Sequence, residues 1–349
     1  MKIIDIINSI KPANAAVAKV AREKLDNLTK PRGSLGVLED CAARYVSARG
    51  DINAKIANPT ILTFAADHGI ADEGVSAFPQ SVTTQMLANF ANNGAAINVL
   101  SRHAGAKLKV IDVGAAGDCS SDKIINRKIA RGTANFAKGP AMTDKQCEEA
   151  LNVGVEIAKI AIEDGATLIC TGDMGIANTT SSSALYSIFL GISGEDSVGR
   201  GTGIDDEKLR KKISVVNEAV SKYSKLKNEP MKVLAAVGGL EIAGICGAIL
   251  GSASMRVPVI VDGFISGAAA ITAIRLNKYV ADYCFFSHLS AEAGHSSALS
   301  KMGVRPLLNL ELRLGEGTGA ALAIHIVSAG LKIMNEMATF SQAGVSEKI

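Results

Sequence analysis

Residues 60–69 read TILTFAADHG, a short apolar run that ends in an acidic residue, a histidine and a glycine. Such a run is typical of a strand buried on both faces, and the residues that follow it favour a turn. The same order, an apolar run and then a longer segment of helical spacing, recurs along the chain. The runs are residues 60–66, 108–113, 167–171, 233–237, 257–261 and 283–286. This alternation predicts an α/β fold with a mostly parallel sheet covered by helices on both faces.

The two ends of the chain lack this alternation. Residues 1–50 show helical spacing only, with a break at residues 30–33, and residues 319–337 form a strong helical segment with no strand after it. We expect both ends to pack together as a smaller helical subdomain. The predicted division is residues 1–55 for the N-terminal helices, 56–300 for the α/β domain, and 301–349 for a loop and the C-terminal helix that completes the subdomain.

Composition limits the class of protein. The chain of 349 residues is 48% hydrophobic, enough for a substantial core, and its net charge is only +3. No run of lysine or arginine is interleaved with aromatic residues, so we do not expect nucleic acid as a partner. The six cysteines are scattered without close pairs, which predicts reduced thiols in a cytoplasmic protein.

Membrane insertion and export are also disfavoured. The N-terminal segment alternates apolar with polar residues and lacks the continuous apolar region of a signal peptide. Residues 233–253 are the most apolar stretch, but they include Glu241 and five glycines. We interpret this stretch as a short strand, a glycine turn and a buried helix.

Two glycine-rich loops could bind an anion. Residues 171–183, TGDMGIANTTSSS, follow a predicted strand and open a predicted helix, whose N-terminus attracts phosphate. From composition alone, ordinary N-capping by Asn178 or a following hydroxyl residue is slightly favoured as the explanation of this loop. Residues 198–206, VGRGTGIDD, place Arg200 among glycines, with Lys212 further on. Neither loop has P-loop or dinucleotide-fold spacing, so ATP hydrolysis and NAD chemistry lose support and a monophosphate is favoured. No local motif indicates a Ser-His-Asp or Cys-His arrangement.

Two groups of histidines and acids require a choice. His288, Glu292 and His295 have the i, i+4, i+7 spacing that would place them on one helix face, where zinc could bind. The segment around them is rich in small polar residues that favour loops, so we interpret both histidines as hydrogen-bonded structural residues without a metal. The pair Asp67 and His68 ends the first predicted strand and is interpreted as orienting a loop.

Four further blocks complete a pattern. They are KPRGSLG at residues 30–36, ADHG at 66–69 leading to FPQSVTTQM at 78–86, VDGF at 261–264, and LGEGTG at 314–319. Together with the two glycine loops, these blocks resemble the nicotinate-nucleotide:dimethylbenzimidazole phosphoribosyltransferase family, in order, from about residue 30 to residue 335. The resemblance implies a doubly wound sheet with a helical subdomain from both termini, a homodimer, and no cofactor or metal.

The resemblance also implies a reaction. The ribose phosphate of nicotinate mononucleotide would move to 5,6-dimethylbenzimidazole or a related base, giving nicotinate and the α-riboside 5′-phosphate for the nucleotide loop of a cobamide. Carried over by position, Glu316 in the loop after residue 301 would be the general base. Phe78, Gln85, Asp173 and Met174 would bind the base. The phosphate and ribose would be bound by Gly175, Asn178, Thr179, Gly201, Gly203, Lys212, Ser290, Gly315 and Gly317.

Several alternatives stay open at this point. Glu316 could simply be an acid that complements the dipole of the helix beginning near Gly319. A dehydrogenase would require a dinucleotide fingerprint that the chain lacks. A non-catalytic nucleotide-binding or sensor protein with the same fold would bind nicotinate mononucleotide as the enzyme does but would release no nicotinate. Asp173 stands where the family usually has Glu, and Ala77 stands where some members have a hydroxyl. Both departures leave the identity of the acceptor base undetermined.

Overall fold

The structure of the protein, a computed structural model, describes residues 2–201 and 203–346. Six parallel strands form one sheet in the order β3-β2-β1-β4-β5-β6. The strand order therefore runs outward in opposite directions from β1 and β4, which makes the sheet doubly wound, as expected. In such sheets the ligand site lies at the carboxyl ends of the strands where the order reverses. The strands are β1 (Thr60–Ala66), β2 (Lys107–Gly114), β3 (Ile124–Asn126), β4 (Ile169–Met174), β5 (Val259–Val261) and β6 (Cys284–Phe286).

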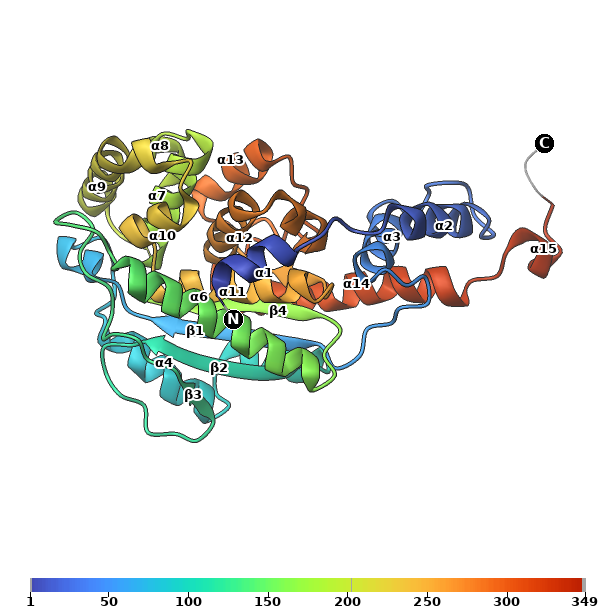
Figure 1. The fold of residues 1–349 in the computed structure, drawn as a ribbon, viewed down its shortest axis with the longest axis horizontal. Helices are drawn as coiled ribbons and strands as arrows, with labels where there is room; N and C mark the ends of the chain where they lie inside the picture. The colour runs from blue at the N-terminus through green and yellow to red at the C-terminus, as the bar shows by residue number, and fades with distance from the viewer. Residues whose placement is uncertain (1, 202, 347–349) are drawn as a thin grey trace.

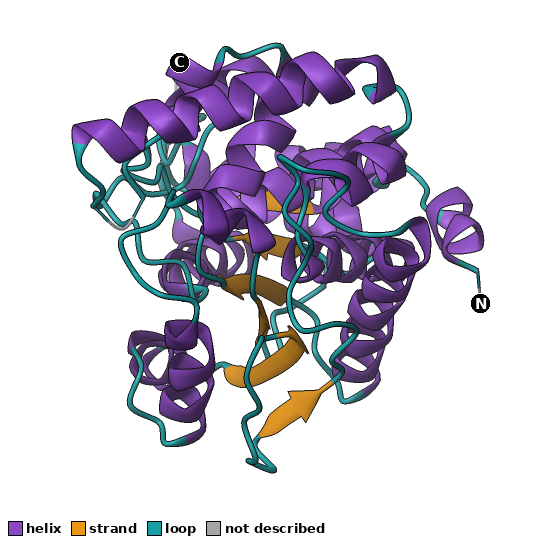
Figure 2. Ribbon diagram, turned by 90° about the vertical axis from the view of Figure 1, so that its left-hand side faces the viewer, coloured by secondary structure: helices purple, strands orange, loops and turns teal. Residues whose placement is uncertain are grey.

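Successive residues of each strand face two different apolar cores. On β1, Leu62 and Phe64 belong to one core, whereas Ile61 and Ala65 belong to the other. This alternation follows from the two-residue period of a strand, and it requires helices on both sides of the sheet (Figure 2). The helices α6 (Asp144–Glu163), α11 (Leu240–Ser254) and α12 (Phe264–Leu276) cover the first face, and α3 (Val37–Arg49), α4 (Ser81–Ala91), α5 (Ala96–His103) and α14 (Thr318–Glu336) cover the second.

The apolar stretch at residues 233–253 contains two helices. The predicted strand at residues 233–237 is wrong, because these residues belong to α10 (Pro230–Val237), whose proline occupies the first turn. A short apolar run does not distinguish a strand from a buried helical turn. The predicted buried helix is confirmed as α11, which crosses α6 so closely that a side chain at Gly154 or Gly247 would overlap the backbone of the other helix.

The remaining strand predictions agree with the structure to within three residues at each end, except that β3 was missed. It has three residues at the edge of the sheet and no apolar run of its own. The other helical segments are α7 (Asn178–Leu190), α8 (Gly194–Ser197), α9 (Asp206–Tyr223), α13 (Ala293–Met302) and α15 (Phe340–Ala343), with 3-10 turns η1 (Gly69–Glu73), η2 (Ser224–Leu226) and η3 (Lys278–Tyr283).

Helices from near both ends of the chain pack together in an arm that projects from the body of the molecule (Figure 1). It consists of α2 (Ala15–Asp26), α3 and the part of α14 that extends out of the body, and these helices pack against one another. The sequence predicts only two helices in residues 1–50, but a third, α1 (Ile3–Ser9), packs on α6 and α11 instead of joining the arm. The helices α3 and α14 share an apolar core with β1, so the arm and the α/β body are not separated by a gap in the packing. The predicted domain boundaries near residues 55 and 300 stay predictions.

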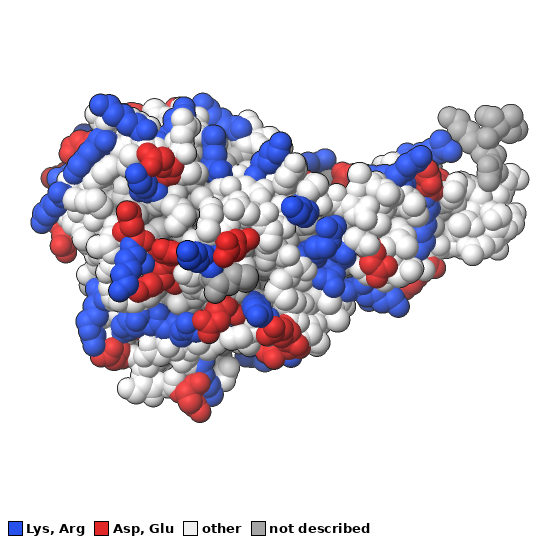
Figure 3. Space-filling view, viewed as in Figure 1, with Lys and Arg blue, Asp and Glu red and all other residues white. Residues whose placement is uncertain are grey.

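Charged residues of both signs are interspersed over the face shown in Figure 3, without a broad basic area.

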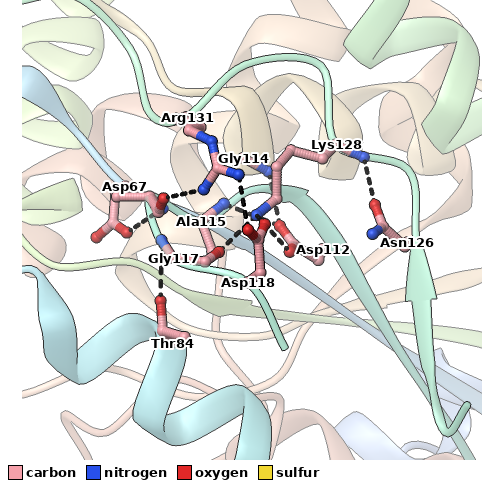
Figure 4. Close-up of polar contacts among 11 residues, drawn as sticks. Asp67, Thr84, Asp112, Gly114, Ala115, Gly117, Asp118, Asn126, Lys128 and Arg131 are labelled. Atoms are coloured by element: carbon pink, nitrogen blue, oxygen red, sulfur yellow. Dashed lines mark hydrogen bonds and ion pairs between the residues drawn. The ribbon is translucent and has the colours of Figure 1, made fainter. Parts of the chain in front are cut away.

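One group at the edge of the sheet, here called the edge cluster, consists of Asp112, Asp118, Lys128 and Arg131 (Figure 4). Asp118 receives hydrogen bonds from Lys128 (2.9 Å) and Arg131 (2.7 Å). In the part of the chain that is described, no helix combines the length and hydrophobicity needed to cross a bilayer.

Candidate active site

A cavity of about 260 Å³ opens where the carboxyl ends of β4, β5 and β6 approach α4 and the loop before α14. It lies beside the point where the strand order reverses, as expected for a doubly wound sheet. Several predicted site residues border it, namely Phe78, Asp173, Met174, Gly175, Asn178, Thr179, Gly201, Ser290, Gly315 and Glu316. The structure therefore brings both glycine loops and the glutamate loop to one cavity.

Glu316 occupies an unusual stretch of backbone. Gly315, Glu316 and Gly317 have φ angles of 81°, 62° and 98°, so three successive residues are left-handed. This conformation costs little for glycine but is strained for a residue with a Cβ. The loop rests on β4 so closely that any side chain at Gly172 would collide with the backbone of Glu316. Strain of this kind is common at functional sites, where neighbouring structure holds it in place.

The Glu316 carboxyl group is buried and faces the cavity. Its Oε2 accepts a hydrogen bond from the backbone N–H of Ile97 (3.1 Å), at the start of α5, and no other hydrogen bond to it is found among the described residues. Burial raises the pKa of Glu316 above its usual value, an effect that the Ile97 bond partly offsets. Glu316 makes no capping hydrogen bond to α14, because Asp262 accepts from the N–H groups of Gly317 and Ala320 there.

Asp173 forms part of the same wall. Its Oδ2 accepts a hydrogen bond from the side chain of Asn178 (3.0 Å), while its buried Oδ1 has no partner among the described residues. Burial, followed by the negative charges of Asp262, Glu241 and Glu316, holds the pKa of Asp173 well above its usual value. This shift favours the protonated form of Asp173, which is able to donate a hydrogen bond. Apolar neighbours complete this end of the cavity: Phe78, Val82, Met86, Met174, Ile176, Phe264, Ile265 and Leu314.

The other end of the cavity has polar and charged groups around Thr179 and Gly201. Lys212 lies behind it, fully buried, and its Nζ donates hydrogen bonds to Thr179 Oγ1 (2.7 Å) and Gly199 O (3.2 Å). Burial lowers the pKa of Lys212 to about 8, so it still carries a proton at neutral pH. Arg313 borders the cavity and donates a hydrogen bond to Gly201 O (3.2 Å). The first residue of α7, Asn178, also borders the cavity. Asn178 does not cap α7, because its side chain binds Asp173 instead.

Four predicted site residues do not border the cavity. Gln85 is exposed on α4, and Gly203 is exposed at a turn with φ 106°. Lys212 contacts the cavity wall only through its hydrogen bond to Thr179. Gly317 follows Glu316 and packs against β1 and β4. The 30–36 block lies in the arm, where Lys30 and Glu39 form a buried ion pair (2.8 Å).

Other residues border the cavity although sequence reasoning did not assign them there. Val82 and Met86 could have been found, because they lie four residues apart on one face of α4, directly after the loop that holds Phe78. Gly263, His288, Glu292 and Arg313 had no such signal, because they follow different strands or belong to loops.

The helix face proposed for His288, Glu292 and His295 does not exist, since α13 begins only at Ala293. His288 Nδ1 lies 2.8 Å from Ser287 Oγ, and His295 Nδ1 accepts from the N–H of Ser290 (2.9 Å), so both histidines are hydrogen-bonded as predicted. Burial lowers the pKa of His288 to about 4 and of His295 to about 3, so both rings are neutral. Among the described residues, no group of three or more His, Cys, Asp or Glu side chains is placed to hold a metal ion.

Asp67 and His68 do more than orient one loop. Asp67 accepts hydrogen bonds from Thr83 Oγ1 (2.7 Å) and from the N–H of Ala116 (2.8 Å), which ties α4 to the end of β1. His68 is buried between Glu241 (Nε2 to Oε1, 2.6 Å) and Ser181 (Nδ1 to Oγ, 3.0 Å). Both residues therefore fix the walls of the cavity from behind.

Comparison with known proteins is consistent across sequence and structure. Residues 10–345 match the model of a phosphoribosyltransferase family. The nicotinate-nucleotide–dimethylbenzimidazole phosphoribosyltransferases of Chlorobaculum parvum and Geobacter sulfurreducens are 52% and 49% identical over 344 residues, covering 98% of this chain and 98% of each relative. A crystal structure of the Thermus thermophilus enzyme of that name superposes with a TM-score of 0.91 at 42% identity, covering 96% of this chain and 100% of that one. The chain therefore belongs to the nicotinate-nucleotide–dimethylbenzimidazole phosphoribosyltransferase family.

Proposed function

We propose that the protein transfers the 5-phosphoribosyl group of nicotinate mononucleotide to 5,6-dimethylbenzimidazole or a related base. Nicotinate and the α-riboside 5′-phosphate are the products, and the latter serves the nucleotide loop of a cobamide. The observation that carries the proposal is the position of the buried Glu316 carboxyl group, which faces the cavity opposite the cationic end near Lys212. Membership of the family supports the same reaction.

The chemistry needs one base. When a ring nitrogen of the benzimidazole attacks the anomeric carbon, the C–N bond to nicotinate breaks and its electron pair returns to the pyridinium ring. Nicotinate leaves with a neutral ring nitrogen and needs no acid, whereas the attacking base must lose the proton on its other nitrogen. Glu316 accepts that proton, and its raised pKa favours the transfer. No pair of carboxyl groups is needed, unlike glycoside hydrolysis.

The two ends of the cavity have separate tasks. The apolar end holds the flat base between Phe78, in the loop before α4, and Met174 on β4. The amides and hydroxyls around Gly175 and Thr179, with Lys212 behind them, bind the phosphate and hold the ribose in position. Fixing the phosphate far from the breaking bond orients the anomeric carbon without stabilising the ground state there.

Substitution Glu316→Gln tests the proposal directly. Glutamine keeps the size and can still accept from Ile97, but it has no basicity. We expect turnover to fall by at least about 100-fold, because a positioned general base contributes roughly 10² to 10⁴ in rate. Binding of nicotinate mononucleotide, measured by calorimetry, should change little. Near wild-type turnover on every accepted base would reject Glu316 as the base.

We also propose a homodimer in the cytoplasm. Closed two-fold pairs are the commonest oligomers, and a cleft of about 1010 Å³ between the arm and α12 and α13 offers a large surface for a second copy. All six cysteines are unpaired, as expected for a reducing compartment. Light scattering at micromolar concentration should give twice the mass of the chain, and a monomer mass would contradict the dimer.

A further inference from the structure

The backbone of Glu316 and of the next residue is held by hydrogen bonds to three neighbours. Its N–H donates to Asp173 O (3.0 Å), and its own carbonyl accepts from Thr63 Oγ1 (2.8 Å). The next N–H, that of Gly317, donates to Asp262 Oδ2 (3.2 Å). The strained backbone is thus held on three sides, by β1, by β4 and by the end of β5.

Asp262 makes a second bond that matters for this arrangement. Its Oδ1 accepts from the N–H of Ala320 (2.8 Å), in the first turn of α14. Gly317 stands at the N-cap position of α14 and has no side chain to cap it. One buried carboxyl group, 1% exposed, therefore joins the glutamate loop to α14 through two different oxygens.

We propose that Asp262 and Thr63 are positioning residues that hold Glu316 in its left-handed conformation and so aim its carboxyl group at the bound base. The proposal rests on the proposed role of Glu316 as general base. A non-glycine residue leaves the left-handed region when its restraints are removed, because that region is strained for it. Such a change rotates the direction of the side chain, and a misplacement of about 1 Å can cost about 100-fold in rate.

A purely structural role would produce a different result. If Asp262 only capped α14, its substitution would lower stability and leave turnover per folded molecule unchanged. If it positions Glu316, the folded variant binds nicotinate mononucleotide normally but turns it over slowly. The kcat value, separated from the KM value, therefore distinguishes the two roles.

Asp262→Asn has a matched control in Asp112→Asn. Both aspartates are buried at the ends of parallel strands and accept backbone N–H groups; Asp112 also pairs with Lys128 (3.3 Å), and the N–H groups of Gly263 and Gly319 also lie against Asp262. At Asp112 both N–H groups, of Gly114 and Ala115, bind the same Oδ1, so asparagine can keep both bonds. At Asp262 they bind different oxygens, so asparagine must lose one. We expect kcat to fall about 10- to 100-fold for Asp262→Asn with KM within about threefold, and to stay within about twofold for Asp112→Asn.

Thr63 provides a second, independent test that does not depend on the folding of Asp262→Asn. Thr63→Val keeps the buried shape but removes the donor to the Glu316 carbonyl, whereas Thr63→Ser keeps the donor. We expect kcat to fall about tenfold or more for valine and to be largely restored by serine. Thr272→Val, which removes a buried hydroxyl bonded within α12, should leave kcat unchanged. Equal kcat for the valine and serine variants of Thr63 would overturn the proposal.

A double-mutant cycle separates this inference from the proposed function. In a Glu316→Gln background, Asp262→Asn should cause no further loss of kcat, because the group that it positions is gone. Losses that multiply would show that Asp262 acts independently, and the positioning role would be rejected. If Glu316→Gln is slow but Asp262→Asn and Thr63→Val are normal, only the positioning role fails. If Glu316→Gln itself has wild-type turnover, both the proposed function and the positioning role fail.

Discussion

The carboxyl groups around the cavity differ sharply from those of the edge cluster. In the edge cluster, Lys128 and Arg131 bind Asp118 and lower its pKa to about 2. Around the cavity, Asp173, Asp262 and Glu316 have no lysine or arginine ion pair among the described residues, and their pKa values are raised by burial, that of Asp262 to about 7. The same chemical group is thus held ionised at one place and inclined to bind protons at the other.

This difference is what a general base requires. A carboxylate paired with cations is already stabilised as the anion, so it gains little by accepting a proton. A buried carboxylate that receives a single backbone bond has a higher proton affinity and accepts the proton of an attacking base more readily. The absence of a cation beside Glu316, over the part of the chain that is described, is therefore as important as the presence of the acid.

The largest effect that would test this contrast is the pH dependence of kcat. Glu316 must be ionised to act, and its raised pKa means that it becomes protonated at a higher pH than an ordinary carboxyl group. We expect kcat to fall about tenfold per pH unit on an acidic limb whose midpoint lies above pH 4.5. The measurement is a pH profile at saturating substrate, which reports the enzyme–substrate complex.

Other carboxyl groups of the cavity titrate as well, so the limb must be assigned. In Glu316→Gln the acidic limb should disappear and leave a low, flat profile. In Asp173→Asn it should remain. An acidic limb that persists in Glu316→Gln would show that another group governs the reaction, and the contrast with the edge cluster would lose its functional meaning.

Much of the fold follows from the sequence because its signals are local. The runs at residues 60–66 and 108–113 are long, apolar and followed by turns, and both form strands with bounds close to those predicted. Residues 233–237 have the same composition, but no strand lies beside them, and Pro230 starts a helix. Tertiary pairing decides between strand and helix for so short a run, and it cannot be seen in the sequence.

The site is less accessible to sequence reasoning, because its residues come from separate strands. The resemblance identified Glu316 and the two glycine loops, and the structure places all of them at one cavity. It assigned no role to Thr63 or to Asp262, although Asp262 lies in the VDGF block, because each contacts Glu316 or its neighbour across the sheet from a sequence distance that no local motif spans. Gln85 is the opposite case, since its block borders the cavity only through Phe78, Val82 and Met86, and its role in base binding stays a prediction.

Lysine offers a second, smaller test of the same contrast. Lys212 is buried behind the cavity with no carboxylate bonded to it among the described residues, whereas Lys128 lies between Asp112 (3.3 Å) and Asp118 (2.9 Å). Lys212→Met keeps much of the volume and removes the charge. We expect KM for nicotinate mononucleotide to rise about 10- to 100-fold, the effect of losing a charge-assisted contact worth about 1.5–3 kcal/mol. Lys128→Met is the control and should leave KM unchanged; equal effects of the two changes would contradict an anion site near Lys212.

The smallest effect is expected at Asp118 itself. Its lowered pKa means that the folded state favours the ionised form, so its contribution to stability is present above the ordinary value of 3.8 and is lost as the pH falls toward about 2. The side chain is exposed, however, and salt screens its pairs with Lys128 and Arg131. Asp118→Asn should therefore shift the melting temperature at pH 7 by no more than about 2 °C, less in high salt, and leave kcat unchanged.

The measurement is thermal unfolding of the wild type and of Asp118→Asn at pH 7 and near pH 2. The difference between their melting temperatures should shrink toward zero near pH 2. A large change in melting temperature that persists in high salt would mean that Asp118 stabilises the fold by more than screened ion pairs. Pairing with cations would then not explain why the acids of the edge cluster differ from Glu316.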